Sequence, residues 1–309
     1  MQILFYADGG AADQWLAELH KALPLADVRV WSEGDSAPAD YAVVWKPPAA
    51  MLQGRTGLKA IFNLGAGVDA ILQLGDALPA GVPVIRLDDA GMAIQMAEYV
   101  THAVLRYFRR FDEFNAQARD HQWRFLKPRR KEDFSVGILG MGVLGARIAD
   151  ALAHFDFPLR SWSRSRKEIP GVHSHAGAEE LDDFLAQSQV LVCVLPLTAE
   201  TTGLLDRATL ALLPKGAYLI NVARGAHVVE RDLLDLLEDG HLAGATLDVF
   251  RDEPLASDHP FWNEPRITIT PHIAALTLRG DSVRQIAAKL KQMERGQPIA
   301  GLVDRTKGY

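Results

Sequence analysis

The chain has 309 residues, more than one compact hydrophobic core usually holds, so we expect two domains. Its composition, 48% hydrophobic and 23% charged, is that of an ordinary globular protein. The net charge of −6 argues against a nucleic-acid partner, because proteins that bind nucleic acid usually carry a basic surplus. The single cysteine, Cys193, excludes an intrachain disulfide. There is no basic leader followed by an apolar stretch, and no run of about 18 apolar residues. We therefore expect a cytoplasmic protein without a membrane partner.

Short apolar runs alternate with stretches of helical period, which is typical of βαβ units and a parallel sheet. In the first third we expect a helix over 12–22 and strands over 3–6, 28–31, 41–45, 60–63 and 84–86. A long helical pattern over 92–111 then connects to the second part of the chain. The polar and basic segment 120–133 that follows is interpreted as a surface arm.

A second βαβ series begins after this arm. Its expected strands are 135–139, 159–162, 190–195, 218–221, 244–248 and 267–270, and its helices are 144–153, 181–187 and 230–239. A last helix over 277–295 returns the chain to the first domain. The predicted fold class is α/β, with two Rossmann-like domains whose parallel sheets carry helices on both faces. The expected domains are 1–98 with 284–309, and 99–283 including the arm.

Three glycines form a Gly-x-Gly-x-x-Gly pattern directly after the first strand of the second series and before a helical pattern. This strand–turn–helix context is the one that a dinucleotide-binding fingerprint requires. Gly140 permits the tight turn, Gly142 lets the backbone approach a pyrophosphate, and Gly145 lets the helix pack on the strand. The N–H groups at the start of that helix face the phosphates. We therefore expect cofactor contacts from Gly140, Gly142, Val143, Leu144 and Gly145.

The end of the next strand distinguishes NAD from NADP. An NAD enzyme usually carries an acidic residue there, which binds the ribose 2′-hydroxyl. This chain has the sequence Ser163-Arg164-Ser165-Arg166 instead. Arg164 and Arg166 can make charge-assisted bonds to a 2′-phosphate, and Ser163 can donate its hydroxyl. The missing carboxylate also removes repulsion against that phosphate. The alternative is a solvated basic turn; we expect NADPH as cofactor, with NADH weaker.

Three later segments each place an ionisable residue after a predicted strand. Arg224 follows the strand 218–221, Glu253 follows 244–248, and His272 follows 267–270. Ligands of open α/β sheets bind outside the carboxyl ends of the strands, so all three side chains can face one crevice. Each residue alone could be structural: a surface arginine, a loop acid or a buried histidine. Their order behind a dinucleotide fingerprint favours a catalytic set.

These motifs resemble the D-isomer-specific 2-hydroxyacid dehydrogenase family, and more narrowly its glyoxylate/hydroxypyruvate reductase A branch. The resemblance covers nearly the whole chain and rests on five ordered motifs, at 65–69, 140–145, 221–225, 248–254 and 271–272. It implies a flavodoxin-like substrate domain beside the dinucleotide-binding domain, a small 2-keto acid as substrate and a homodimer. It also implies reduction of glyoxylate to glycolate and of hydroxypyruvate to D-glycerate.

The resemblance implies a role for each catalytic residue. Arg224 binds the substrate carboxylate and keto oxygen through its planar guanidinium. His272 donates a proton to the keto oxygen, and Glu253 holds the imidazole and favours its charged form. Substrate contacts are further expected from Trp45 and from the backbone N–H groups of Ala66 and Gly67. Cofactor contacts are further expected from Pro196, Ala223 and Asp248.

Other interpretations stay open at this point. Trp45 could be a core residue, and Lys46 beside it a solvated loop charge. The pocket could take bulkier 2-keto acids, or the protein could be an NAD-linked relative such as a phosphoglycerate dehydrogenase. A non-enzymatic alternative is a nucleotide-sensing protein similar to transcriptional corepressors. His173 and His175 flank Ser174 in a predicted loop and are interpreted as surface residues, with a metal pair as the less favoured alternative.

Overall fold

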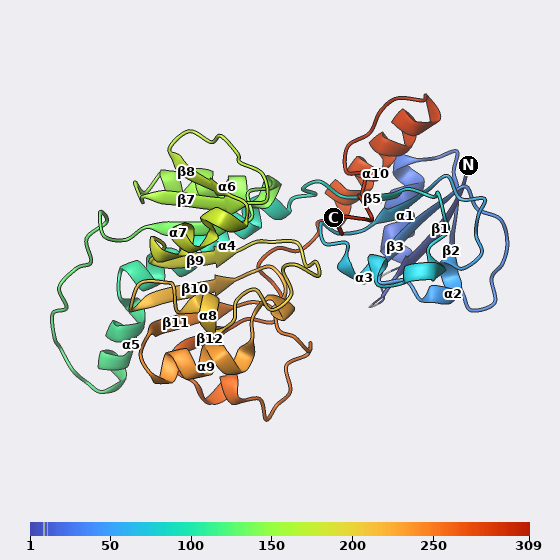
Figure 1. Ribbon diagram of the computed structural model, residues 1–309. Coiled ribbons are helices and arrows are strands. Elements are labelled where there is room, and N and C mark those ends of the chain that lie inside the picture. The colour runs from blue at the N-terminus through green and yellow to red at the C-terminus, as the bar shows by residue number, and fades with distance from the viewer. Residues whose placement is uncertain (9, 11) are drawn as a thin grey trace. The chain divides into compact units, whose positions relative to one another are not determined.

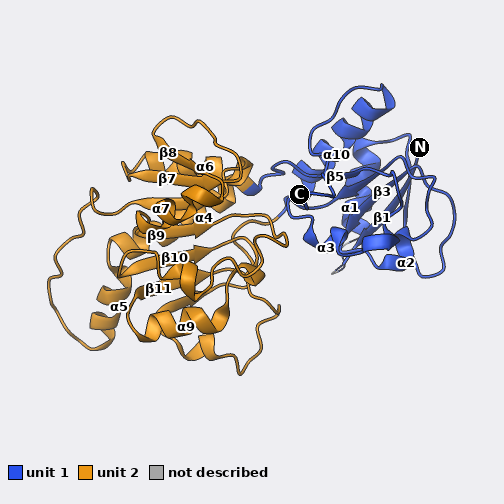
Figure 2. Cartoon of the chain, viewed as in Figure 1, with its two compact units in different colours: residues 1–92, 277–309 blue, residues 93–276 orange. Residues whose placement is uncertain are grey.

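The computed structural model describes residues 1–8, 10 and 12–309, and it divides into two compact units. Unit 1 comprises Met1–Met92 and Thr277–Tyr309, and unit 2 comprises Ala93–Leu276 (Figure 2). The chain passes between the units twice. The division comes at the start of helix α4 (Met92–Phe108) and shortly before helix α10 (Arg279–Glu294), rather than within these helices at the expected 98/99 and 283/284.

Unit 1 is built on a parallel sheet with the strand order β2-β1-β3-β4-β5 (Figure 1). The strands are β1 (Gln2–Ala7), β2 (Asp27–Val30), β3 (Tyr41–Trp45), β4 (Ala60–Asn63) and β5 (Val84–Arg86). Its helices are α1 (Ala12–Ala22), α2 (Ala49–Leu52), α3 (Asp69–Leu72), η1 (Gly75–Ala77) and α10. Helix α1 packs against α10, so the last helix lies in unit 1.

Unit 2 is built on a longer parallel sheet with the order β12-β11-β10-β9-β6-β7-β8. The strands are β6 (Val136–Leu139), β7 (Leu159–Ser163), β8 (Val172–Ala176), β9 (Val190–Cys193), β10 (Ala217–Asn221), β11 (Leu242–Leu247) and β12 (Ile267–Ile269). Besides α4, its helices are α5 (Phe111–Arg119), α6 (Val143–Ala153), η2 (Ala178–Glu180), α7 (Leu181–Ala186), α8 (Arg207–Leu210), η3 (Gly225–His227), α9 (Glu230–Glu238) and η4 (Pro260–Asn263).

Both faces of the unit 2 sheet are covered by helices that pack apolar side chains against it. Successive residues of a strand point to opposite faces, and in β9 Val190 packs in one core cluster while Leu191 packs in the other. Helices α4 and α6 lie on the first face, and α7 and α9 lie on the second. The strand order reverses between β6 and β9, because the chain runs from β6 outward through β7 and β8 before β9 returns beside β6. The predicted fold class is confirmed, and this reversal is where such sheets bind nucleotides.

Three local predictions differ from the structure. The helix expected over 92–111 ends at Phe108, because Arg110 adopts a left-handed conformation (φ 62°) before α5 begins. Helix α5 itself was not predicted. His173 and His175 lie in strand β8 rather than in a loop, and His175 is buried, where its Nε2 lies 3.2 Å from Asp183 Oδ2. The interpretation of His175 as a surface residue is therefore wrong, because its ring packs beside Phe184.

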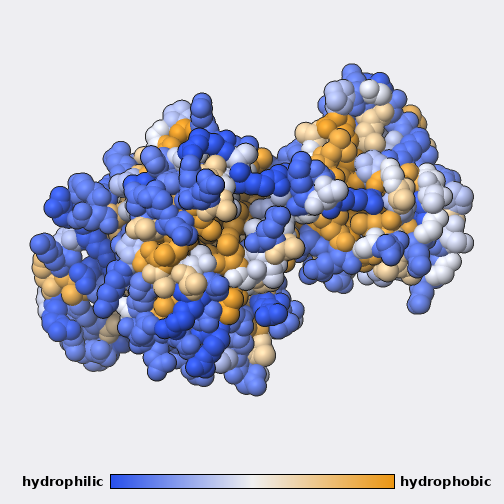
Figure 3. Space-filling model, viewed as in Figure 1, coloured by the Kyte–Doolittle hydropathy of each residue, from blue (hydrophilic) through white to orange (hydrophobic). Residues whose placement is uncertain are grey.

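Within the described part of the chain, no helix is long and apolar enough to cross a membrane. The view in Figure 3 shows hydrophilic residues over much of the outer surface of unit 2, with apolar atoms visible between them.

Candidate active site

The predicted acid–base pair forms at the carboxyl ends of β11 and β12. Glu253 lies in the loop after β11, and His272 follows β12. The Nδ1 atom of His272 lies 2.7 Å from Glu253 Oε2, and Glu253 Oε1 accepts the Phe250 N–H at 3.0 Å. Both side chains are partly exposed. Because Nδ1 faces the carboxylate, Nε2 is the ring atom left to exchange a proton with a ligand.

A buried carboxylate, Asp248, organises the loop that carries His272. It is 1% exposed, and it accepts hydrogen bonds from Ile273 N and Ala274 N, each at 2.8 Å, and from Thr270 Oγ1 at 2.6 Å. Its backbone oxygen accepts the His272 N–H at 2.8 Å. His272 has a φ of 57°, a conformation that L-residues with side chains adopt at an energetic cost. Asp248 therefore stabilises a strained turn that presents the imidazole.

The loop that carries Arg224 is held by two buried side chains that the sequence analysis did not single out. Asn221, the last residue of β10, donates from Nδ2 to Arg224 O at 3.0 Å and accepts Ala223 N at 3.1 Å. His227 lies between the Arg224 backbone and Pro196 O, at 3.3 Å from the latter. The Arg224 side chain is partly exposed and donates from Nη1 to Ala223 O at 2.7 Å.

Gly225 allows this loop to lie directly against the loop after β11. A Cβ atom at Gly225 would lie 1.9 Å from the carbonyl carbon of Phe250, closer than any real contact. The backbone of Gly225, next to Arg224, therefore lies directly against that of Phe250, three residues before Glu253. This brings the arginine and the His272–Glu253 pair to one edge of the sheet.

The glycine loop has the geometry that a dinucleotide requires. Gly140 has a φ of 104°, and a Cβ there would meet Val194 O at 2.8 Å. A Cβ at Gly145 would lie 2.0 Å from Gly140 O, so the glycine lets α6 pack on the turn. A Cβ at Gly142 would meet nothing within 4 Å, so a ligand can approach the backbone there. Val143 opens α6 and is exposed, whereas Leu144 packs against the core. These residues fit a pyrophosphate, and the loop stands beside the reversal of strand order.

The basic turn after β7 lies next to this loop in the sheet order. Ser163 donates from Oγ to Ser165 O at 2.8 Å. Arg166 forms an ion pair with Glu180 and a hydrogen bond with Ser174 O, so a phosphate would share this guanidinium with Glu180. An open pocket of about 650 Å³ lies beside the turn, lined by residues 166–170 and 172–174. Binding of a 2′-phosphate at this turn stays a prediction.

In unit 1, the predicted substrate residues gather where β3 and β4 end. Trp45 is the last residue of β3, and its ring lies so close to Gly65 that a Cβ there would be 2.5 Å from Cζ3. Ala66 and Gly67 follow in the same loop, after Asn63 at the end of β4. Lys46 is exposed and has a φ of 46°.

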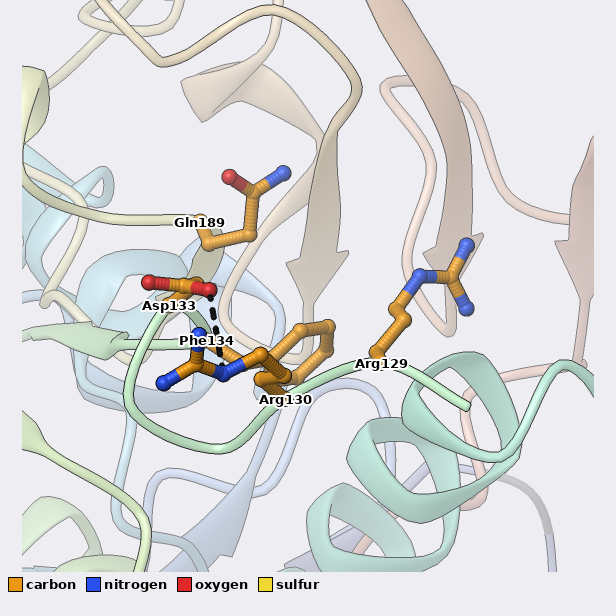
Figure 4. Close-up of a pocket in the computed structure, with 5 residues that line it drawn as sticks. All are labelled: Arg129, Arg130, Asp133, Phe134 and Gln189. Atoms are coloured by element: carbon orange, nitrogen blue, oxygen red, sulfur yellow. Dashed lines mark ion pairs between the residues drawn. The ribbon is translucent and has the colours of Figure 1, made fainter. Parts of the chain in front are cut away.

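A smaller pocket of about 170 Å³ lies at the opposite edge of the unit 2 sheet (Figure 4). It is lined by Phe134 and Gln189, which precede β6 and β9, and by Arg129, Arg130 and Asp133. Figure 4 shows Arg130 directed toward Asp133, 3.8 Å away, and Arg129 turned to the other side. Because this pocket lies at the amino ends of the strands, it is separate from the candidate active site.

The sequence analysis gave no role to four residues that hold these loops: Asn63, Asn221, His227 and Thr270. Asn63, Asn221 and Thr270 share one signal, a polar residue at or next to the end of a strand, whereas His227 lies further on, in η3. Such a residue needs hydrogen-bond partners when it is buried, but the sequence does not show which ones.

The parallel sheet, the glycine loop and the His272–Glu253 pair at one edge define a dinucleotide-dependent oxidoreductase. Residues 101–274 match the family model of the D-isomer specific 2-hydroxyacid dehydrogenase, NAD binding domain. The chain is 55% identical to glyoxylate/hydroxypyruvate reductase A of Serratia proteamaculans, over the full length of both. The chain therefore belongs to the D-isomer specific 2-hydroxyacid dehydrogenase family, and within it to the glyoxylate/hydroxypyruvate reductase A branch.

Two solved structures match over the whole chain. The D-isomer specific 2-hydroxyacid dehydrogenase of Xanthobacter autotrophicus, in complex with NADPH and MES, has a TM-score of 0.94 and 40% identity. The NADPH-dependent glyoxylate/hydroxypyruvate reductase of Sinorhizobium meliloti, in complex with NADP and sulfate, has a TM-score of 0.92 and 36% identity. Each match covers 100% of this chain and 99% of the other. The predicted family and fold are confirmed.

Proposed function

We propose that this chain reduces small 2-keto acids with NADPH, converting glyoxylate to glycolate and hydroxypyruvate to D-glycerate. The observation that carries the proposal is the 2.7 Å contact between His272 and Glu253, on the same sheet edge as the loop that is open at Gly142. The relatives from Serratia and Sinorhizobium are named for these two substrates, and NADPH or NADP is bound in both matched structures.

Unit 2 is proposed as the cofactor-binding domain. Residues 140–145 bind the pyrophosphate through backbone N–H groups, and Ser163, Arg164 and Arg166 bind the 2′-phosphate. Pro196, Ala223 and Asp248 flank the nicotinamide end. When bound, NADPH supplies the hydride that reduces the keto carbon.

The catalytic residues act on the other partners of the reaction. Arg224 binds the substrate carboxylate and orients the keto oxygen with its planar guanidinium. His272 Nε2 donates a proton to the keto oxygen as that oxygen becomes a hydroxyl. Glu253 holds Nδ1 and fixes the orientation of the ring. The transferred hydride and this one proton complete the 2-hydroxy acid.

Unit 1 is proposed as the substrate-binding domain. The N–H groups of Ala66 and Gly67 bind the carboxylate, and Trp45 limits the size of the substrate. The ring of Trp45 lies directly against Gly65, so it forms a wall beside the loop that holds Ala66 and Gly67. A bulky side chain at this place favours small 2-keto acids over bulkier ones.

The test is steady-state oxidation of NADPH and NADH, followed at 340 nm, with glyoxylate, hydroxypyruvate and a bulky 2-keto acid. We expect turnover with the small acids and a clear preference for NADPH. His272→Ala should lose most of kcat and keep its affinity for NADPH. His259→Ala is the matched control, because it removes a similar His–Glu pair, with Glu230 at 3.3 Å, outside the proposed site. Absence of turnover in the wild type would favour a nucleotide-sensing binding protein.

We further propose that the chain forms a homodimer through the segment that includes α5 and the arm. Trp123 is fully exposed and Phe125 is 85% exposed, and Phe111 and Phe114 of α5 are exposed as well. Figure 1 shows this arm as a long loop that leaves the body of unit 2. Exposed aromatic residues grouped in one segment are typical of protein interfaces.

The mass in solution tests the dimer. We expect light scattering to give twice the mass of the chain, and a Trp123→Ser, Phe125→Ser variant to be monomeric. Leu25→Ser is the control, because Leu25 is a similarly exposed apolar residue outside the arm. A monomeric wild type would refute the proposal.

Cytoplasmic location is proposed on the single cysteine, which is buried and unpaired, and cell fractionation tests it.

A further inference from the structure

A buried side-chain amide lies under the glycine-rich loop of unit 1. Asn63 is the last residue of β4 and is 2% exposed. Its Nδ2 donates to Gly65 O at 3.2 Å and to Gly67 O at 2.9 Å. A side-chain amide has two N–H donors, so Asn63 uses both of them on this one loop.

These two bonds fix the direction of the neighbouring N–H groups. The Gly65 carbonyl shares a peptide plane with the Ala66 N–H, and the Gly67 carbonyl shares one with the Val68 N–H. In a trans peptide the C=O and N–H bonds point in opposite directions, and the cis bond in the described residues is at Glu253–Pro254. The N–H groups of Ala66 and Val68 therefore point away from Asn63, and the peptide that carries the Gly67 N–H is held between them.

Ala66 and Gly67 are partly exposed, so a ligand can reach this part of the loop. In the part of the chain that the structure describes, none of the N–H groups of Ala66, Gly67 and Val68 donates a hydrogen bond. Val68 is nevertheless buried, and buried N–H groups normally have an acceptor. Successive N–H groups in a turn form a concave site for an anion. Glycines permit several peptide orientations, so an external anchor is needed to hold the one that faces an anion.

We propose that Asn63 is a positioning residue that presents these N–H groups to the substrate carboxylate. The proposal rests on the proposed function. Asn63 acts through the loop and does not itself touch the substrate. Gly65 also packs against the Trp45 ring. The Asn63 side-chain amide therefore positions the proposed carboxylate site beside the ring that is proposed to limit substrate size.

The test compares carboxylate binding with turnover. Asn63→Ala and Asn63→Ser are assayed for kcat, for KM with glyoxylate and for KM with NADPH. The dissociation constant of oxamate, a carboxylate that is not turned over, is measured in the presence of NADPH by protein fluorescence. Tyr41→Phe is the control, because it removes a 2.5 Å hydrogen bond to Glu294 from the first residue of β3 in the same unit.

We expect Asn63→Ala to raise KM for glyoxylate and the dissociation constant of oxamate about tenfold, as the loss of two neutral hydrogen bonds predicts. The KM for NADPH should stay within about twofold of the wild-type value. Asn63→Ser keeps one donor, so its KM for glyoxylate and its dissociation constant for oxamate should lie between those of the wild type and Asn63→Ala. If Asn63→Ala does not fold, the serine variant decides. Unchanged oxamate binding in a folded variant overturns the proposal, as does an equal loss in Tyr41→Phe. A wild type that binds oxamate but reduces no 2-keto acid contradicts the proposed function instead.

Discussion

Replacing Thr270 with valine should loosen the turn that presents His272. Thr270 has one hydroxyl proton, which it donates to Asp248 Oδ1 at 2.6 Å, so the Tyr99 hydroxyl at 2.5 Å must donate to Thr270 Oγ1. Burial raises the pKa of Tyr99 to about 12, which keeps that donor protonated at neutral pH. Valine preserves the shape of threonine but removes both bonds. A hydrogen bond to a charged acceptor contributes about 1.5–3 kcal/mol and a neutral one about 1 kcal/mol.

We therefore expect Thr270→Val to lower the free energy of unfolding by about 3 kcal/mol, and Tm by about 5–10 °C. Asp248 still accepts the hydrogen bonds from the Ile273 and Ala274 N–H groups, so the turn should persist. Because His272 is then held less firmly in position, kcat should be about tenfold lower. Calorimetry and steady-state kinetics with NADPH and glyoxylate measure both effects. Thr270→Ser should restore both values, and Tyr99→Phe should cost about 1 kcal/mol with little effect on kcat. A valine variant with wild-type Tm and kcat would refute the role assigned to this chain of hydroxyls.

Three further predictions concern other parts of the chain. Gly142→Ala should leave Tm unchanged but raise KM for NADPH, because the added Cβ fills the open space beside the loop. Gly225→Ala should instead lower Tm sharply, because its Cβ would lie 1.9 Å from the carbonyl carbon of Phe250. Equal Tm values for the two variants would contradict this prediction. Ser163→Asp should raise KM for NADPH at least about tenfold and leave turnover with NADH, because its carboxylate repels a 2′-phosphate; the ratio of kcat/KM for the two cofactors measures this. The hydrogen bond from Arg29 is the main cause that lowers the pKa of Asp35 in the folded protein. The charged carboxylate therefore stabilises the fold at pH values above its unfolded pKa of about 4. This stabilisation is lost as the pH falls through the lower pKa of the folded state. The Tm difference between wild type and Asp35→Asn should therefore be constant from pH 7 to about 5 and shrink below about 4; a difference that persists in acid counts against the ion pair.

The sequence predicted the sheets well because buried parallel strands are continuous apolar runs. It missed β8, whose sequence Val-His-Ser-His-Ala alternates polar residues, and α5, which has few apolar residues to mark a buried face. The left-handed Arg110 that separates α4 from α5 leaves no mark that a pattern can detect.

The candidate site shows the same limit. Arg224, Glu253 and His272 were found from their places after strands, and the roles given to them stay predictions. The side chains that hold their loops were not found, because their partners are distant in sequence: Tyr99 and Thr270 are 171 residues apart. Asp248 was predicted to contact the nicotinamide, and its hydrogen bonds to the His272 loop became visible only in three dimensions.

The strand order separates two functions along one edge of the unit 2 sheet. The loops after β12, β11 and β10 carry the proposed catalytic residues, whereas the basic turn follows β7, on the far side of β9 and β6. With neighbouring strands about 4.8 Å apart, β7 and β10 are separated by about 14 Å. If the turn binds the 2′-phosphate as proposed, mutations in it should alter the preference for NADP without disturbing the histidine or the arginine. With this layout, the cofactor preference of such an enzyme can change during evolution while its reaction stays the same.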